Sequence, residues 1–504
     1  MKFIDDLLNS ITMYKVVLYG LGAITISGFV YALLGLLPFT VLSLAISLVV
    51  ILALCWALNA FFARIFSVPS NVESVWISGL ILFLILRPAS TAYEFFGVIL
   101  LCLIAIASKY ILTWEKVHVF NPVAIALVVM GLVGSDLAIW WAGSTIMLPL
   151  VLIIGLLIVH KIKRFQMFFG FLIMALLMIA LASYRQQLPI TDSLWTALIS
   201  WPLFFFGTVM LTEPLTTPTR HNYQLLYGII VGVITGSQIH IGTIYSTPEL
   251  ALVVANIFAF LVSNKQKMVI TLKSKHAEAA NLYDFSFSTP KQLTFEPGQY
   301  IEWTFGHDHP DQRGIRRYFT IASAPEEKEL HLGVKIAPDG SSFKKALLAM
   351  EPGQQLIVGQ VSGDFVLPED ATTKLVFIAG GIGVTPFRSH IQHLIHTKQK
   401  RDVVLLYACA TEKDFVYQSI FDQGSKAFDL KVHYIASDRE RVAKDWSGKV
   451  GHIDAKMLHE LVPDFSERTF YISGPGAMVA AYTQLLRSLN VPSNQIKTDY
   501  FPGF

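Results

Sequence analysis

Charge is divided very unequally along this chain of 504 residues. Residues 1 to 264 carry 11 Lys or Arg and 9 Asp or Glu, whereas residues 265 to 504 carry 28 and 27. An ordinary soluble protein does not segregate charge in this way, because a soluble helix needs a charged outer face. The division therefore predicts a polytopic membrane domain over residues 1–264 and a soluble half over residues 265–504.

Ten apolar stretches in the first half have lengths that suit membrane-spanning helices. With the N-terminus in the cytoplasm, eleven basic residues between Lys2 and Lys267 lie inside and two, Arg87 and Arg185, lie outside. We therefore expect a multi-pass protein of the cytoplasmic membrane, with its N-terminus and its soluble half in the cytoplasm. The stretches cover residues 16–37, 40–62, 72–86, 91–108, 121–135, 145–160, 165–183, 194–212, 224–240 and 248–263.

Composition excludes several kinds of partner and cofactor. The soluble half mixes both signs of charge evenly and lacks the clustered basic surface that nucleic-acid binding needs. Three scattered cysteines, Cys55, Cys102 and Cys409, cannot supply the four thiolates of an iron–sulfur cluster. The histidines of the membrane half lie near predicted helix ends, which disfavours haem, and we predict no metal site. Organic redox cofactors remain.

Residues 268 to 368 show short runs with strand character, broken by Pro-Gly turns at 297–298 and 352–353. This pattern predicts a small antiparallel β-barrel over residues 265–370. One strand carries Arg317, Phe319 and Thr320, where a guanidinium suits a pyrophosphate, a ring suits an isoalloxazine face, and a hydroxyl suits a flavin nitrogen. Further on, Gly340-Ser341-Ser342 opens a predicted helix whose free amides suit a phosphate.

From residue 374, strands at 374–379, 402–407, 430–436 and 468–472 alternate with helices near 385–397, 414–424, 454–461 and 475–489. The alternation predicts a doubly wound parallel α/β domain over residues 371–504. The first strand runs into Gly380-Gly381-Ile382-Gly383 and a helix start at Thr385-Pro386, where a pyrophosphate could approach the backbone. The last strand repeats this pattern at Ser473-Gly474-Pro475, with Ser473 within reach of a nicotinamide.

These four segments, in this order, resemble the ferredoxin-NADP reductase superfamily over residues 268–504. The resemblance implies FAD in the barrel, NAD(P)H on the second domain and hydride transfer between them, with NADH and NADPH both left open. It implies that Thr320, Ser473, Asp499 and the C-terminal Phe504 act at the flavin. Phe319 and Ser473 stand where tyrosine and cysteine are common. The implied FAD contacts are Arg317, Phe319, Thr320, Ile321, Ser323, Val334, Lys335, Gly340, Ser341 and Ser342, and the implied NAD(P) contacts are Gly380, Gly381, Ile382, Gly383, Thr385, Pro386, Gly474, Pro475 and Met478.

The membrane half carries two segments that its apolar character does not explain. Taken alone, Asn121-Pro122 is a helix start, and residues 212–219 are a proline-rigid connector whose hydroxyls satisfy helix ends. The chain resembles a ten-helix family at Val75 to Pro88, at Phe120-Asn121-Pro122, over Phe206 to Thr219 and at Tyr227-Gly228. This family comprises the RnfD component of the Rnf electron transport complex and the NqrB component of the sodium-translocating NADH:quinone reductase.

In that family a Thr-Asp-Pro-x-Thr-x-Pro-Thr segment lies beside a membrane flavin, and here Glu213 replaces the aspartate. Gly143-Ser144-Thr145 lacks the alanine of the family's covalent FMN site. The resemblance therefore implies a second, noncovalent flavin, FMN or riboflavin. Its implied contacts are Thr212, Glu213, Thr216, Thr217 and Thr219.

The sequence thus predicts a membrane flavoprotein that oxidises NAD(P)H via FAD and passes electrons to a flavin or quinone in the membrane half. Two alternatives remain open: a transmembrane reductase that delivers electrons outward to metal or oxygen, and a transporter regulated by its flavin domain. The histidines of the soluble half, including His390, His393 and His396, are expected to be solvated.

Overall fold

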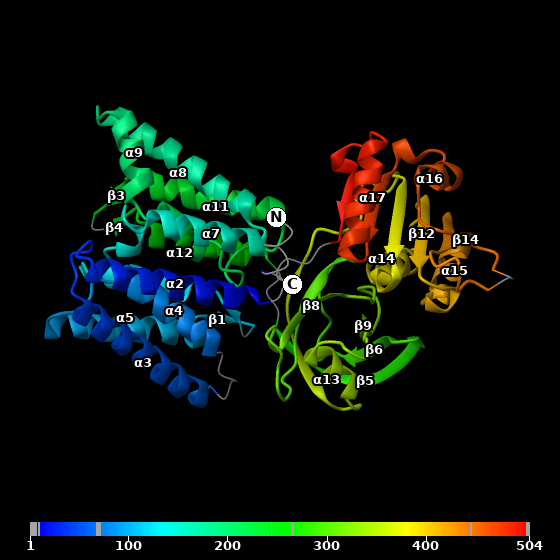
Figure 1. Cartoon of the computed structure of the whole chain (residues 1–504), viewed down its shortest axis with the longest axis horizontal. Coiled ribbons are helices and arrows are strands. Elements are labelled where there is room, and N and C mark those ends of the chain that lie inside the picture. The colour runs from blue at the N-terminus through cyan, green and yellow to red at the C-terminus, as the bar shows by residue number, and fades with distance from the viewer. Residues whose placement is uncertain are drawn as a thin grey trace. The chain divides into compact units, whose positions relative to one another are not determined.

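The computed structural model describes residues 8, 11–66, 72–115, 117–242, 244–263, 267–443 and 446–499. The chain divides into two compact units between Lys265 and Gln266. The first unit is helical and the second contains two β-sheets with their helices (Figure 1).

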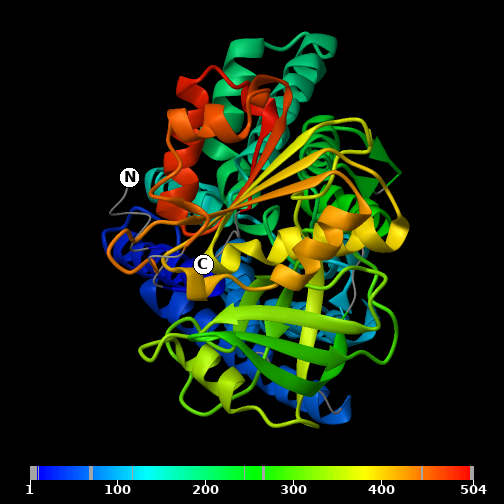
Figure 2. The ribbon, with the colours of Figure 1, turned by 90° about the vertical axis from the view of Figure 1, so that its right-hand side faces the viewer.

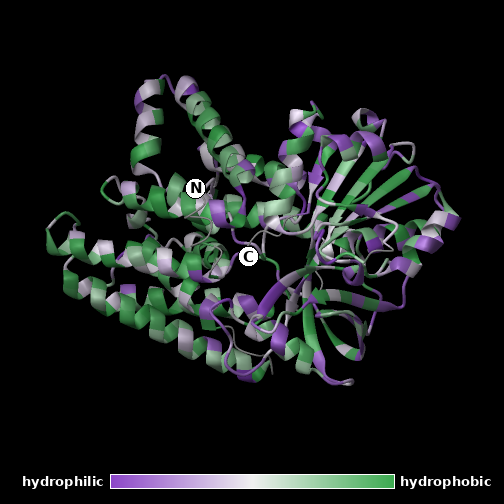
Figure 3. Cartoon of the chain, turned by 45° about the vertical axis from the view of Figure 1, so that its right-hand side comes forward, coloured by the Kyte–Doolittle hydropathy of each residue, from purple (hydrophilic) through white to green (hydrophobic). Residues whose placement is uncertain are grey.

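Helices in the first unit coincide with the apolar stretches, and most of their residues are hydrophobic (Figure 3). Two short hairpins, β1 (Thr113–Trp114) with β2 (Val117–His118) and β3 (His240–Ile241) with β4 (Ile244–Tyr245), join some of them. The helices are α2 (Met13–Leu33), α3 (Val41–Ile65), α4 (Val72–Ile85), α5 (Ala92–Ile111), α6 (Pro122–Leu132), the 3-10 turn η1 (Trp141–Gly143), α7 (Leu148–Ile162), α8 (Phe165–Arg185), α9 (Ile190–Ser200), α10 (Leu203–Phe205), the π-helical η2 (Phe206–Met210), α11 (His221–Gly236) and α12 (Pro248–Val262).

Fewer helices than ten meet the length and composition expected of a complete span. Within the described residues, α2, α3, α5 and α8 do so, and α9 with Leu203–Met210, bent by 58°, would make a fifth. The apolar helices α4, α6, α7 and α12 are shorter. The structure therefore shows an N-terminal helical region with four or five candidate spans, and ten crossings stay a prediction.

Helix α11 packs against α8 through glycines spaced four residues apart. A Cβ atom at Gly228, Gly232 or Gly236 would collide with the carbonyl oxygens of Met167, Phe171 and Ala175 respectively. Small residues at this spacing let two helix backbones approach closely, which is a common basis of packing between membrane helices.

The first domain of the second unit, residues 268–362, is a six-stranded antiparallel sheet in the order β8-β7-β10-β5-β6-β9. At its ends, the Ala322 N–H after β8 donates to the His331 carbonyl on β9 at 3.0 Å. This bond joins the end strands at one point, and closure into a barrel stays a prediction. The elements are β5 (Met268–Ala279), β6 (Leu282–Ser288), β7 (Tyr300–Thr304), β8 (Arg316–Thr320), β9 (Glu329–Lys335), α13 (Ser342–Ala349) and β10 (Gln355–Ser362).

The second domain of this unit, residues 375–498, contains a parallel sheet in the order β14-β13-β12-β11-β15-β16. Strand order reverses between β11 and β15, and in such sheets ligands bind beyond the carboxyl ends of the strands at this switch point. The predicted parallel α/β domain is confirmed. Its elements are β11 (Leu375–Gly380), η3 (Gly381–Val384), α14 (Thr385–Thr397), β12 (Val403–Cys409), η4 (Glu412–Asp414), α15 (Gln418–Ala427), β13 (Leu430–Ala436), β14 (Lys449–Val450), α16 (Ala455–Leu461), η5 (Phe465–Glu467), β15 (Thr469–Ser473), α17 (Gly476–Ser488), η6 (Ser493–Gln495) and β16 (Ile496–Thr498).

Helix α14 follows β11 and η3 in the chain and lies between the two sheets of the second unit (Figure 2). Arg388 donates to the Ala322 carbonyl at 2.7 Å and pairs with Glu327 at 2.8 Å, and both side chains are mostly buried. His390 Nε2 lies 3.0 Å from the carbonyl oxygens of Pro297 and Phe365. The expectation that His390 is solvated is wrong: it is fully buried, and burial lowers its pKa to about 3.

Candidate functional site

Two glycine turns meet backbone to backbone at the switch point. Pairing of Ala379 with Ser473 sets β11 beside β15, and a Cβ atom at Gly383 would lie 2.6 Å from the Cα of Gly474. Gly381 has a φ of +52° and no atom within 4 Å of where its Cβ would be. The backbone there is open to a ligand at the start of α14, as a dinucleotide site requires.

Thr385 and Pro386 form the first turn of α14, as predicted. Ile382 is partly buried and packs against the hydrophobic core of the domain that contains the parallel sheet. Met478 of α17 and Pro475 lie against Gly380 on the other side of the turn.

Three predicted site residues converge where the two domains of the second unit meet. Asp499 Oδ2 accepts hydrogen bonds from Ser473 Oγ at 2.9 Å and from Thr320 Oγ1 at 3.4 Å. Burial raises the pKa of Asp499 to about 7, and the two hydroxyls oppose this rise. The carboxyl group can therefore change its charge near neutral pH. Phe504, the fourth predicted residue, lies outside the described residues.

A group of polar and charged side chains surrounds the start of α13. Arg317 is 4% exposed and donates through Nη2 to both oxygens of Asp311, at 3.0 and 3.2 Å. Ser342 donates its backbone N–H to Asp311 Oδ2 at 3.2 Å, and Ser341 caps the helix. Gly340 completes the turn, with its N–H donating to the Ala337 carbonyl at 2.9 Å. Arg317 and the amide of Ser342 thus hold one carboxylate together.

The other predicted FAD contacts differ in whether their side chains or only their backbone groups could contact a ligand. Phe319 is partly buried, with its ring 6.0 Å from that of Phe343, which also lies under the Arg317 guanidinium. Ile321 and Val334 belong to the hydrophobic core, which leaves only their backbone for a ligand. The Ser323 hydroxyl accepts the His331 N–H at 3.1 Å, and the Lys335 carbonyl accepts from Lys344 Nζ at 2.9 Å.

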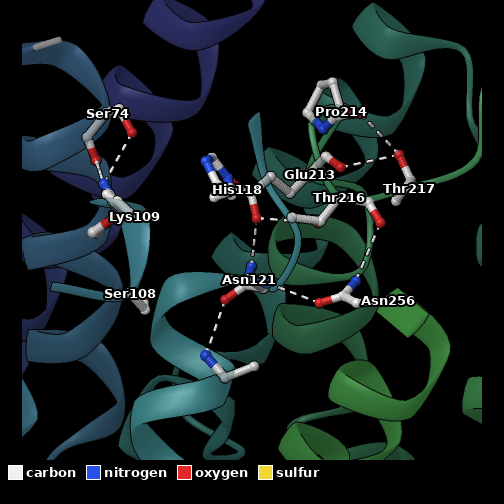
Figure 4. Close-up of polar contacts among 12 residues, drawn as sticks. Ser74, Ser108, Lys109, His118, Asn121, Glu213, Pro214, Thr216, Thr217 and Asn256 are labelled. Atoms are coloured by element: carbon white, nitrogen blue, oxygen red, sulfur yellow. Dashed lines mark hydrogen bonds and ion pairs between the residues drawn. The ribbon is translucent and has the colours of Figure 1, made fainter. Parts of the chain in front are cut away.

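A second polar cluster lies in the first unit around Glu213 (Figure 4). Glu213 Oε2 accepts from Asn121 Nδ2 at 2.8 Å and from Thr216 Oγ1 at 3.2 Å, and Oε1 lies 3.5 Å from His118 Nε2. Asn121 also caps α6, as its sequence context predicts. Asn256 Oδ1 accepts the Asn121 N–H at 2.8 Å, so the carboxylate is held from several elements.

The hydroxyls of the 212–219 segment mostly satisfy backbone groups. Thr212 Oγ1 donates to the Thr208 carbonyl and Thr217 Oγ1 to the Glu213 carbonyl. Thr217 Oγ1 also accepts from Arg164. The Thr219 carbonyl lies 3.5 Å from Gln224 Nε2. Of the five predicted contacts, Thr212 and Glu213 line a cleft.

That cleft is lined by residues of α2, α4, α6 and α7 together with the 209–214 segment. Its apolar walls include Ile77 and Ile81 of α4, and its polar groups include Ser78, Asn121 and Glu213. The fifteen described residues that line it include no Lys or Arg. Sequence reasoning assigned no site role to Asp311, His118 or Asn256. Asp311 belongs to no motif although it lies six residues before Arg317, whereas His118 and Asn256 lie far along the chain from Glu213 and Asn121, which they contact.

Comparison with known proteins supports this interpretation of the second unit. Residues 268–366 match the oxidoreductase FAD-binding domain family and residues 377–484 match the oxidoreductase NAD-binding domain family. The chain is 26% identical to the glycine betaine monooxygenase reductase subunit of Chromohalobacter salexigens over 40% of this chain and 55% of that protein. It is 29% identical to the F component of the Na(+)-translocating NADH-quinone reductase of Actinobacillus pleuropneumoniae over 43% of this chain and 56% of that protein.

Among solved structures, the FAD/NAD-binding domain of nitric oxide dioxygenase from Vibrio cholerae covers 46% of this chain and 98% of that chain, at 22% identity and a TM-score of 0.41. The chain spans about half the length of the curated relatives that it matches. Both family matches lie in the second unit. Residues 268–366 and 377–484 are therefore an FAD-binding and an NAD-binding oxidoreductase domain.

Proposed function

We propose that the chain is a membrane flavoenzyme that oxidises NAD(P)H through FAD and passes the electrons to a flavin or a quinone in its first unit. The observation that carries the proposal is the convergence of Thr320, from the FAD-binding domain, and Ser473, from the NAD-binding domain, on Asp499. Such a meeting of titratable and hydroxyl groups between two cofactor domains suits hydride transfer.

The residues present fit FAD and NAD(P)H. Arg317 and the Ser342 amide already hold a carboxylate, so they have the charge and the donors for a pyrophosphate. Gly381 and Gly383 leave backbone open for the dinucleotide. When bound, FAD would accept a hydride and release electrons singly. Thr320 and Ser473 would orient the reacting rings, and Asp499 would set the local charge.

The cleft beside Glu213 is the proposed site of the acceptor in the first unit. Its apolar walls suit a flat ring system, and its serine, asparagine and threonine groups suit ring carbonyls. Its described lining carries a carboxylate, and Lys109 donates to Ser74 of that lining at 2.9 Å, so a quinone, riboflavin and the phosphate-bearing FMN are all candidate occupants.

Ten crossings with both ends in the cytoplasm complete the proposal. Contacts between loops agree with this arrangement. Arg87 lies 4.0 Å from Asp136, in two loops that ten crossings place outside. His118 contacts Glu213 in two loops that ten crossings place inside.

Purified full-length protein tests the proposal directly. We expect a noncovalent FAD that NADH or NADPH bleaches, reduction of ferricyanide, and reduction of a short-chain quinone. Flavin extraction with and without acid precipitation, followed by stoichiometry, would show whether a second flavin is present and whether it is covalent. A protein that binds no flavin and oxidises neither nucleotide would refute the proposal.

The acceptor site has its own test in Glu213→Gln. Loss of the charge weakens the hydrogen bonds that hold Asn121 and Thr216 at the cleft, each worth about 1.5–3 kcal/mol, so quinone reduction should slow by about tenfold or more while ferricyanide reduction stays unchanged. Glu249→Gln is the control, because Glu249 is a buried acid of the same unit on α12 that does not line the cleft. Equal quinone rates in both variants would place the acceptor elsewhere.

A further inference from the structure

The carboxylate of Asp311 occupies the same donors that the proposed function assigns to the FAD pyrophosphate. It receives two hydrogen bonds from Arg317 Nη2 and one from the Ser342 N–H at the start of α13. The contact is reciprocal, because the Asp311 N–H donates to Ser342 Oγ at 2.9 Å. His307 Nε2 lies 3.0 Å from the same hydroxyl. The 306–315 loop is thereby fastened to the helix start.

Arg317 has little capacity left for a second anion. Its Nη1 donates to the carbonyl oxygens of Arg313, Gly314 and Arg316, at 2.7, 3.1 and 2.7 Å. Its Nη2 faces Asp311, and its side chain is almost completely buried. A pyrophosphate that pairs with Arg317 must therefore take the donors that Asp311 holds, since two anions on the same donors repel each other.

The surrounding charge favours such an exchange. Arg313 lies 3.8 Å from Asp311, and Lys344 of α13 is close enough to Arg313, Arg317 and Lys335 that burial and their repulsion lower its pKa. Although burial opposes ionisation of Asp311, Arg317 holds the pKa of this carboxyl below its usual value. One carboxylate thus faces an excess of positive charge, which a doubly charged pyrophosphate balances better.

We propose that Asp311 is an internal competitor for the FAD pyrophosphate, so that flavin binding requires release of the 306–315 loop from Arg317 and α13. This inference rests on the proposed FAD site. It assigns to the loop a regulatory role, in which the charge on one side chain sets flavin affinity. A side chain that only orients Arg317 would have the opposite effect on affinity, which makes the sign of the change decisive.

The role of Asp311 can be tested by measuring flavin affinity. The full-length protein is stripped of flavin and titrated with FAD, and binding is followed by fluorescence. Asp311→Asn keeps an acceptor oxygen for Arg317 and removes the competing charge, so FAD should bind about tenfold tighter, equivalent to about 1.4 kcal/mol. Asp308→Asn is the matched control, because Asp308 is exposed in the same loop, and its affinity should equal that of the wild type. Unchanged or weaker binding to Asp311→Asn would overturn the inference.

Kinetics of the wild type provide a second measurement that needs no variant. If the loop must release first, the observed rate of FAD association should level off at high FAD concentration. A rate that rises linearly to the highest concentration would overturn the inference. Failure of the wild type to bind FAD at any concentration would instead refute the proposed function, so the two failures are distinct.

Discussion

At the scale of single residues, two hydroxyls and one carboxyl control the charge at the meeting point of the FAD-binding and NAD-binding domains. Burial raises the pKa of Asp499 to about 7, above the ordinary aspartate value of about 3.9. Below that pH the group is neutral, and above it the group is negative. We expect flavin reduction by NAD(P)H to slow as pH rises through about 7, because a carboxylate opposes the arrival of a hydride.

Stopped-flow bleaching of the flavin on both sides of neutrality measures this dependence. Asp499→Asn should remove the inflection. Ser473→Ala deletes the bond of 2.9 Å that stabilises the carboxylate and should move the inflection upward, and Thr320→Ala, with its bond of 3.4 Å, should move it less. An inflection that persists in Asp499→Asn would assign it to another group.

A buried ion pair provides a second prediction at this scale. Arg388 and Glu327 pair at 2.8 Å with side chains only 6% and 15% exposed. Glu327→Ala would leave the guanidinium charge buried without its partner, at a cost of about 3–5 kcal/mol. The temperature at which FAD is released should fall markedly. Glu326→Ala is the control, because Glu326 pairs with the partly exposed His393, and its effect should stay within about 0.5 kcal/mol.

At the scale of elements, close approach of α8 and α11 depends on glycine. A Cβ atom at Gly232 would lie 2.5 Å from the Phe171 carbonyl oxygen and 2.9 Å from the Met174 Cβ. Gly232→Ala should therefore destabilise the protein by about 1–3 kcal/mol through overpacking. Gly22 of α2 has no atom within 4 Å of its Cβ position, and Gly22→Ala should be neutral or stabilising by up to about 1 kcal/mol.

Thermal unfolding of the two glycine variants in the same detergent checks this prediction. A midpoint for Gly232→Ala equal to or above that of Gly22→Ala would show that the α8–α11 contact is looser than the backbone distances imply. The pair controls for helix propensity, since both changes add the same methyl group to a helix interior.

At the scale of the whole molecule, the proposed topology makes a prediction of its own. Alkaline phosphatase fused after Arg87 or after Arg185 should be active, because ten crossings place both positions outside. Fusions after Lys163 or after the last residue should be inactive. Activity of the fusion at the last residue would place the FAD-binding and NAD-binding domains outside the cytoplasm, away from the cell's reduced nicotinamide nucleotides, and would refute the proposed reaction.

Elements were predictable where local pattern alone decides them. The helix over residues 385–397 has the predicted bounds, because Thr385-Pro386 starts it and its residues repeat with helical period. The bounds of the strands between residues 268 and 368, and their order in the sheet, came only from the structure, because strands depend on partners that the local sequence does not specify. The prediction that His390 is solvated was wrong for the same reason, because His390 is buried by the FAD-binding domain, which packs against α14.

Hydropathy, periodicity and glycine spacing were enough to specify the helical half, the order of the two cofactor domains, and the residue types of their motifs. These signals act between neighbours in the chain, so they can be recognised before any folding is known. Three sets of contacts emerged only from the folded chain: Thr320 and Ser473 share Asp499, Asp311 holds Arg317, and Asn121 and His118 hold Glu213. Each of them pairs charges or hydrogen-bonding groups across folded elements, and such pairs gain their strength only where folding has removed water.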